Sequence, residues 1–198
     1  MDKQILKKLY INEKLSSAQI GKKLSVSPSK VNYWLKKFNI QKRSLSESQY
    51  IKQNPNGDPF SKKLNLSKND LFLCGLGLGL YWGEGTKASP SSVRLGNTDP
   101  KLIRCFINFL EKIYNVDKSR ITFSIQIFHD LNKEGVEAFW RKELQARKSQ
   151  FYKTTVSPSQ STGTYKKRSQ HGVITIYFNN TKLRNILVSE IEKLRQMY

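Results

Sequence analysis

Apolar side chains recur at helical spacing through the first part of the chain. Ile5, Leu6 and Leu9 form one apolar stripe. The same spacing continues in two further segments through Ile20, Leu24, Val31, Leu35 and Phe38. Spacings of three and four residues are typical of amphipathic helices, so the sequence predicts a small all-helical domain over residues 1–43.

Start signals for two short helices lie within residues 17–40, SAQIGKKLSVSPSKVNYWLKKFNI. We expect Ser17 to cap the first helix, which ends near Leu24, and Ser27 to cap the second, with Pro28 at its first position. This pattern resembles a helix-turn-helix. Its small core is predicted to contain Ala18, Ile20, Leu24, Val26, Val31 and Leu35.

The second of these helices has a polar and basic outer face. That face consists of Ser29, Lys30, Asn32, Tyr33, Lys36 and Lys37. In a helix-turn-helix such a face enters the major groove of DNA, with its first residues nearest the bases. An ordinary helical hairpin with a solvated basic face fits the same pattern, because helix-turn-helix patterns are degenerate. The formal net charge of +20 on 198 residues favours DNA, since it attracts polyanions.

Residues 44–66 interrupt the helical spacing with Ser, Asn, Pro and Gly, which indicates a linker or an extended arm. Beyond them, helical and strand patterns alternate. Strands are predicted from SSVRLGNT, RITFSIQIF, QFYKTTVS and GVITIYF, and helices over residues 100–114, 133–144 and 182–197. Residues 67–198 are therefore predicted to form a second domain with a small antiparallel sheet, and the fold class to be α+β.

A glycine-rich apolar stretch, GLGLGLYWGEG, occupies residues 75–85. The apolar run that overlaps it, residues 71–82, is shorter than the roughly 20 residues that cross a bilayer. The first residues, MDKQILKKLY, lack a secretory apolar core, so we expect a cytoplasmic protein without a membrane partner. No strand precedes the glycines and no GKS or GKT follows them, which argues against a phosphate-binding loop.

The same stretch is better interpreted as a helix. Ser67 is a candidate N-cap, with Asp70 at the third helical position. One side of this helix, with Leu73, Leu76 and Leu80, is expected to pack on the core of the second domain.

A stripe of glycines marks another side of this helix. Gly75, Gly79 and Gly83 share one face because they are four residues apart. Each glycine inside a helix costs about 1 kcal/mol relative to alanine. Close approach of a second helix backbone compensates for that cost, so the stripe predicts a helix–helix contact.

The segment GLGLYWGEG, residues 77–85, resembles the LAGLIDADG motif of homing endonucleases. Gly79 and Leu80 match the Gly-Leu of the motif, Glu84 takes the place of its last acidic residue, and Gly85 that of its final glycine. The element order over residues 67–197 also resembles the αββαββα domain of that family, with a curved antiparallel sheet and one extra helix over residues 100–114. Two positions depart from the motif: Trp82 stands where the family has an earlier Asp, and Gly77 where it has Leu.

The resemblance implies a catalytic centre shared by two motif helices. This chain has one motif, so the family pattern implies a homodimer that forms through Gly75, Gly79 and Gly83. Glu84 from each chain, with the Gly83 backbone, would hold two or three Mg²⁺ ions shared across the dimer. Two-fold symmetry implies a near-palindromic double-stranded DNA site.

The resemblance also implies DNA contacts along the sheet, for which the candidates are Arg94, Arg120, Ser124, Gln126, Tyr152 and Lys153. The loop run Lys166, Lys167 and Arg168 is expected to contact phosphates. A peripheral lysine assists catalysis in this family; we rank Lys153 first because it lies in a predicted strand, with Lys87, Lys166 and Lys167 as alternatives.

Two functions follow from these features. The first is a Mg²⁺-dependent, site-specific DNA endonuclease, a hydrolase with a helix-turn-helix that adds affinity. The second is a non-cleaving transcriptional regulator that keeps the LAGLIDADG fold. Because non-cleaving members usually lose the metal-binding carboxylate, Glu84 favours the endonuclease.

Overall fold

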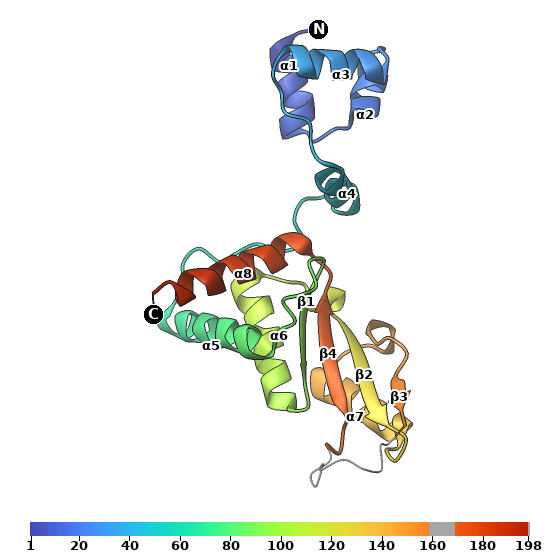
Figure 1. The fold of residues 1–198 in the computed structure, drawn as a ribbon, viewed down its shortest axis with the longest axis vertical. Helices are drawn as coiled ribbons and strands as arrows, with labels where there is room; N and C mark the ends of the chain where they lie inside the picture. Colours follow the sequence, from blue (N-terminus) through green and yellow to red (C-terminus); the bar gives the residue numbers. More distant parts are fainter. Residues whose placement is uncertain (159–168, 198) are drawn as a thin grey trace. The chain divides into compact units, whose positions relative to one another are not determined.

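The computed structural model describes residues 1–158 and 169–197. The chain divides into two compact units, Met1–Pro59 and Phe60–Tyr198. The first is helical and the second combines helices with a four-stranded sheet, so the protein belongs to the α+β class, as predicted (Figure 1).

The first unit contains a short helical array. Its elements are α1 (Lys3–Lys7), a π-helical turn (Lys8–Asn12), α2 (Ser17–Lys23), α3 (Pro28–Lys37) and α4 (Leu45–Gln53). The two predicted helices after residue 16 are confirmed, and Ser27 caps α3 with Pro28 in its first turn. The cap of α2 is Ser16 and not Ser17, because the Ser16 hydroxyl accepts from the backbone N–H of Gln19 in a capping box.

The core of this unit contains most residues of the predicted apolar stripes, although Ile5 is 50% exposed. The fully buried or nearly buried residues are Leu6, Leu9, Tyr10, Ile20, Val31, Leu35 and Ile40, with Leu24 and Val26 packed against them. Ala18 was predicted to join this core but is exposed. It lies two positions from Ile20, so it faces away from the buried side of α2.

The segment predicted as a linker contains a helix. α4 begins after Ser44, whose hydroxyl accepts from the backbone N–H of Glu47 while Glu47 accepts from the backbone N–H of Ser44. No residue of α4 is buried. Further along, the backbone N–H of Ser61 donates to the Tyr114 carbonyl at 2.9 Å, so the second unit begins earlier than the predicted residue 67.

In the second unit, helices and strands mostly alternate along the chain. Its elements are α5 (Lys68–Glu84), β1 (Val93–Asn97), α6 (Pro100–Tyr114), the 3₁₀ turn η2 (Lys118–Arg120), β2 (Thr122–Phe128), α7 (Lys133–Leu144), the 3₁₀ turn η3 (Lys148–Gln150), β3 (Thr155–Ser157), β4 (Val173–Phe178) and α8 (Thr181–Arg195).

The sequence predicted an antiparallel sheet, but the sheet is mixed. Its strand order is β1-β4-β2-β3. β4 pairs antiparallel with β1 and β2, whereas β3 pairs parallel to β2. The parallel pair arises because α7 crosses over between β2 and β3. β3 and β4 pair with opposite edges of β2 and so are not neighbours, although consecutive strands in an αββαββα domain would ordinarily lie side by side.

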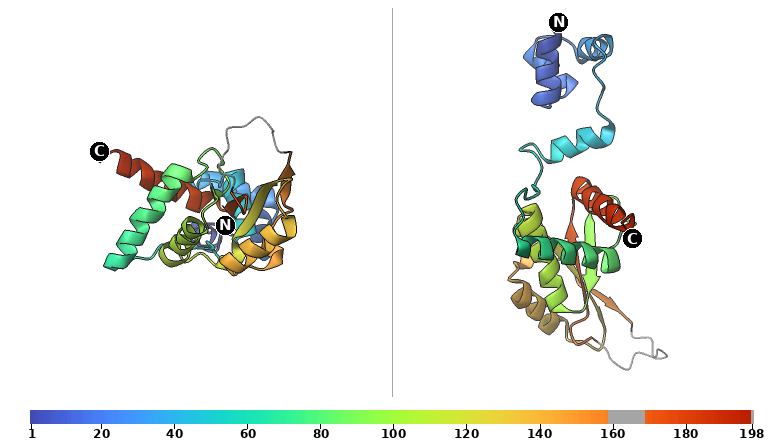
Figure 2. Two further views of the ribbon diagram at one scale, coloured as in Figure 1. Left: turned by 90° about the horizontal axis from the view of Figure 1, so that it is seen from below. Right: turned by 90° about the vertical axis from the view of Figure 1, so that its left-hand side faces the viewer.

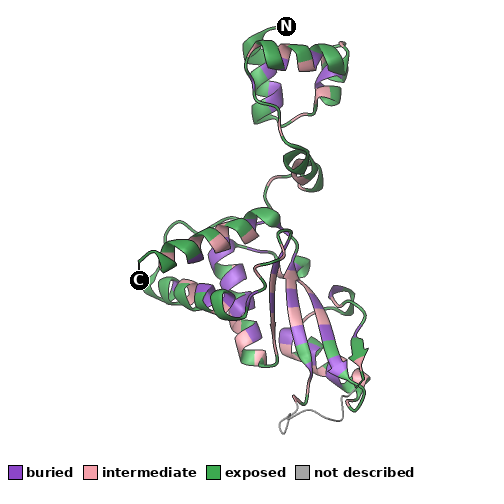
Figure 3. Cartoon of the chain, viewed as in Figure 1, coloured by how far each residue is buried: buried purple, intermediate pink, exposed green. Residues whose placement is uncertain are grey.

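One face of the sheet is covered and the other is open. Residues of β1, β2 and β4 alternate between buried and more exposed positions, as half-buried strands do (Figure 3). α6 and α7 lie against the covered face, and α5 and α8 lie toward β1 (Figure 2). Among the described residues of the second unit, no helix covers the opposite face (Figures 1 and 2).

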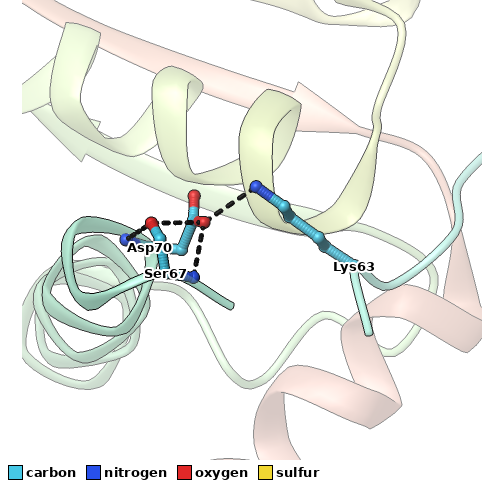
Figure 4. A network of polar contacts seen from close by, with 3 residues as sticks. All are labelled: Lys63, Ser67 and Asp70. Carbon is cyan, nitrogen blue, oxygen red and sulfur yellow. Dashed lines mark hydrogen bonds and ion pairs between the residues drawn. The ribbon is translucent and has the colours of Figure 1, made fainter. Parts of the chain in front are cut away.

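The start of α5 is fixed by a carboxylate network (Figure 4). The Asp70 carboxylate accepts from the Lys63 ammonium at 2.8 Å, from the Ser67 hydroxyl at 2.7 Å and from the Ser67 backbone N–H at 2.9 Å. The Lys63 hydrogen bond, followed by those from Ser67, holds the pKa of the Asp70 carboxyl well below its usual value of 3.8. This network confirms the predicted cap at Ser67.

The network predicts how stability depends on pH. Because the folded-state pKa of Asp70 is depressed, its contribution is complete above the unfolded-state pKa and is lost as pH falls toward the folded-state value. Asp70→Asn should therefore be less stable than the wild type at pH 7, and the difference should shrink as pH falls below about 4. Urea unfolding of both proteins from pH 7 to pH 2 measures this, and parallel pH profiles would contradict it.

Candidate functional site

Helix α5 packs on the core through one side only. Leu78 and Tyr81 are buried, and the Tyr81 ring stacks on Phe106 with centroids 5.8 Å apart. Gly77 is also buried, and a Cβ at this position would overlap the ring of Phe109. Among the four glycines within α5, the one that packs closely in the monomer is therefore Gly77, which the predicted stripe does not include.

The opposite side of α5 is open. Around each of Gly75, Gly79 and Gly83 there is space for a Cβ without any neighbour within 4 Å. Large apolar residues on the same side are exposed: Leu71, Phe72, Leu76 and Trp82. We call these seven residues the glycine face.

Leu76 belongs to the glycine face although the sequence predicted it in the core. Its side chain is 40% exposed, whereas Leu73 and Leu80 pack against the core as predicted. The reason is helical spacing: Leu76 lies four residues after Phe72 and three before Gly79, so it shares their side. The glycine face is thus a largely open apolar surface, on which Arg195 of α8 lies over the Trp82 ring at 5.4 Å.

Glu84 is the last residue of α5, and its position is set by the strand beside it. Gly85 forms an antiparallel bridge with Leu95, and the Thr86 backbone N–H donates to the Arg94 carbonyl at 2.9 Å. Glu84 is exposed, and its carboxylate forms no hydrogen bond or ion pair with another described residue. Because it stands at the negative end of the helix dipole, its charge is unfavourable for α5 itself.

The positively charged side chain of Lys87 lies at this helix end. The Lys87 ammonium donates to the carbonyl of Trp82 at 2.5 Å and to that of Tyr81 at 3.5 Å. Arg184, from α8, donates in turn to the Lys87 carbonyl. Lys87, an alternative catalytic lysine in the sequence, is therefore held by the C-terminal carbonyls of α5. Arg184 was missed because no local pattern links residues so far apart in sequence.

The donor atoms at this end fit a hard divalent cation only in part. Glu84 and Gly83 are exposed residues, and their carboxylate and carbonyl oxygens are donors of the kind that Mg²⁺ prefers. One chain supplies a single carboxylate there, and the described residues contain no group of three or more His, Cys, Asp or Glu side chains that could hold a metal. A complete Mg²⁺ site would therefore need donors from a second chain or from DNA.

The open face of the sheet presents an aromatic and polar cluster. Arg94 lies over the Tyr177 ring at 5.2 Å, and the Tyr177 hydroxyl is 3.2 Å from the Ser124 hydroxyl. Tyr152 meets Tyr177 edge to face at 5.7 Å and accepts a hydrogen bond from Thr122. Three of the predicted contacts, Arg94, Ser124 and Tyr152, are thus brought together. Tyr177 was not predicted, although alternation within GVITIYF places it on this face.

The remaining predicted sheet contacts are more scattered. Gln126 is exposed on the same face and donates to the Ser157 hydroxyl at 3.4 Å. Arg120 is exposed at the end of η2, just before β2. Lys153 is exposed, but it precedes β3, which begins only at Thr155, so the reason for ranking it first among the lysines is not met.

The loop run Lys166, Lys167 and Arg168 lies outside the residues that the structure describes.

The predicted DNA-binding face of α3 is exposed for the most part. Ser29, Lys30, Tyr33, Lys36 and Lys37 are exposed, whereas Asn32 is half-buried. The Asn32 side-chain oxygen accepts from the Ser17 hydroxyl at 3.0 Å. Asn32 is therefore directed toward α2 and does not share the centre of the exposed face.

None of the described helices has the length and apolar character needed to cross a membrane. No family model, curated protein or solved structure matches the chain.

Proposed function

We propose that the protein is a site-specific endonuclease that cuts double-stranded DNA as a homodimer with a divalent metal. One observation carries this proposal: Glu84, exposed and without a partner among the described residues, stands at the end of a helix whose apolar glycine face is open. Neither feature stabilises the monomer. Both are accounted for if a second copy of α5 packs on the glycine face and brings a second Glu84 to the same centre.

The proposed dimer would form through the glycine face. Each of Gly75, Gly79 and Gly83 weakens an isolated helix by about 1 kcal/mol relative to alanine, and the monomer uses none of them for packing. Two helices that cross at glycines approach closely and make extensive van der Waals contact. The exposed Phe72 and Leu76 would be buried by the same contact.

In this proposal the chain supplies oxygen donors and DNA contacts. Glu84 and the Gly83 carbonyl of each copy would hold Mg²⁺, as the resemblance to the LAGLIDADG motif implies. When bound, the metal would activate water and offset charge on the phosphate. The pairing of Gly85 with Leu95 of β1 fixes the backbone next to Glu84, and this would hold the carboxylate of each copy at the shared centre.

The DNA contacts in the proposal come from both units. The open sheet face carries Arg94, Tyr152 and Tyr177, and Arg94 lies on β1, the strand that pairs with Gly85 at the end of α5. The exposed basic residues of α3 would add contacts to the major groove and to phosphates. The net charge of +20 would favour both. A two-fold dimer would recognise a near-palindromic site.

A DNA-binding regulator is the second candidate. It is favoured by the exposed basic residues of α3, which would bind DNA whether or not the chain cuts it. It uses the same α3 and sheet surfaces, and differs only in the absence of cleavage.

The test begins with selection of a DNA site from a random pool by the full chain. The selected duplex is then incubated with the protein and Mg²⁺, Mn²⁺ or EDTA. We expect breaks in both strands with either metal and none with EDTA. Selective binding without breaks at any metal concentration would favour the regulator.

A further inference from the structure

Tyr33 stands at the centre of the exposed face of α3. It is two residues from each of Val31 and Leu35, which are fully buried, so it lies about 200° around the helix from each. The residue is 58% exposed. The largest side chain on this face is thus directed away from the core.

The Tyr33 ring is nevertheless held in place. The Trp34 ring meets it edge to face with centroids 5.4 Å apart, and Trp34 in turn packs on Phe38 at 5.1 Å. The Lys37 ammonium lies 4.7 Å from the Trp34 ring centroid and 5.9 Å from that of Tyr33. An aromatic ring held before binding loses little conformational entropy on contact with a partner.

The other polar residues of this face suit different tasks. Asn32 is tied to Ser17, and Lys37 is engaged with the two rings. Lys30 and Lys36 are exposed ammonium groups, which are suited to phosphates as point charges. Ser29 is a small exposed side chain in the first turn of α3, whereas Tyr33 combines an apolar surface with a hydrogen-bonding group at the centre of the face.

We propose that Tyr33 determines the base preference of the helix-turn-helix unit. Its ring would contact a thymine C5-methyl group in the major groove, and its hydroxyl would form a hydrogen bond with a base edge. Lys30 and Lys36 would contact phosphates and add affinity without base preference. The inference rests on the DNA-binding part of the proposed function and is independent of cleavage.

Site selection with four full-length proteins tests this role: the wild type, Tyr33→Ala, Tyr33→Phe and Lys36→Ala. We expect Tyr33→Ala to lose the preference for thymine at one position per half-site. Its affinity for the wild-type site should fall roughly ten- to a hundredfold, with binding to random DNA unchanged. Tyr33→Phe should keep the thymine preference. Lys36→Ala should weaken binding to all sequences alike and lower the salt slope by about 1.

The outcomes separate this inference from the nuclease proposal. Unchanged base preferences in Tyr33→Ala, or a uniform loss like that expected for Lys36→Ala, would overturn the role of Tyr33. A wild-type protein that selects no DNA site would overturn both proposals. A Tyr33-dependent preference without metal-dependent cleavage would support the inference and remove the nuclease.

Discussion

Replacing Gly79 with Leu is expected to give a folded monomer that no longer cuts DNA. Gly79 lies in the middle of the glycine face, and nothing in the monomer approaches its Cβ position within 4 Å. Leucine also has a higher helix propensity than glycine, so the monomer should keep its stability. In the proposed dimer, however, the added side chain would separate the two helices.

The expected size of this effect follows from overpacking. One oversized side chain in a packed interface typically costs about 1–3 kcal/mol, and a two-fold interface contains two copies. The dissociation constant of the dimer should therefore rise at least roughly tenfold. Sedimentation over a concentration series measures the dissociation constant. Glu134→Gln in α7, which lies outside the glycine face, is the control and should dimerise like the wild type. A Gly79→Leu protein that dimerises like the wild type would show that α5 does not form the interface.

The second large effect concerns two neighbouring glycines that should respond to alanine with opposite signs. Gly77→Ala places a Cβ against the ring of Phe109, which is fully buried and packs against Phe106 and Tyr114. Because these rings leave little room for movement, we expect the overpacking cost to exceed the gain in helix propensity, with a net loss of about 1–2 kcal/mol.

Gly79→Ala is the matched control for this prediction. It makes the same chemical change two residues later, where the Cβ meets no neighbour. The monomer should gain up to about 1 kcal/mol. Hydrogen exchange of β2 and β4 amides, at a protein concentration where both variants are monomeric, reports on the second unit alone. Equal effects of the two substitutions would contradict the orientation of α5.

Local features were predictable because local chemistry decides them. The caps at Ser27 and Ser67 follow from side chains that satisfy the first N–H groups of α3 and α5. The alternation within residues 120–128 likewise predicted β2. α4 was not predicted because the Pro and Gly residues after it are typical of a linker, although Ser44 and Glu47 form a capping box three residues apart.

Non-local features were not predictable in the same way. The packing of Gly77 on Phe109 and the contact of Arg184 with Lys87 join residues that are distant in sequence. The parallel pairing of β2 and β3 depends on where the chain returns after α7. Helical spacing alone shows which residues share a side of α5, but not which side meets the core. That is why Leu76 was assigned to the wrong one.

The residues of the candidate site were predictable from the motif, but their exposure and their contacts with the rest of the chain were not. The sequence singled out Glu84 and the three glycines of the stripe. The structure adds that Glu84 is exposed at the end of α5 and that Lys87 binds the adjacent carbonyls. It also shows that Arg94, Tyr152 and Tyr177 share the open sheet face.

Strand-resolved cleavage of the selected DNA site by Glu84→Gln is the most direct test of the proposed function. The wild type and Glu134→Gln, which makes the same charge change at an exposed position of α7, serve as references. We predict that with Mg²⁺ both references cut both strands, whereas Glu84→Gln cuts neither and binds the site within a few fold of the wild type. Cleavage by Glu84→Gln at the wild-type rate would contradict the central role of Glu84.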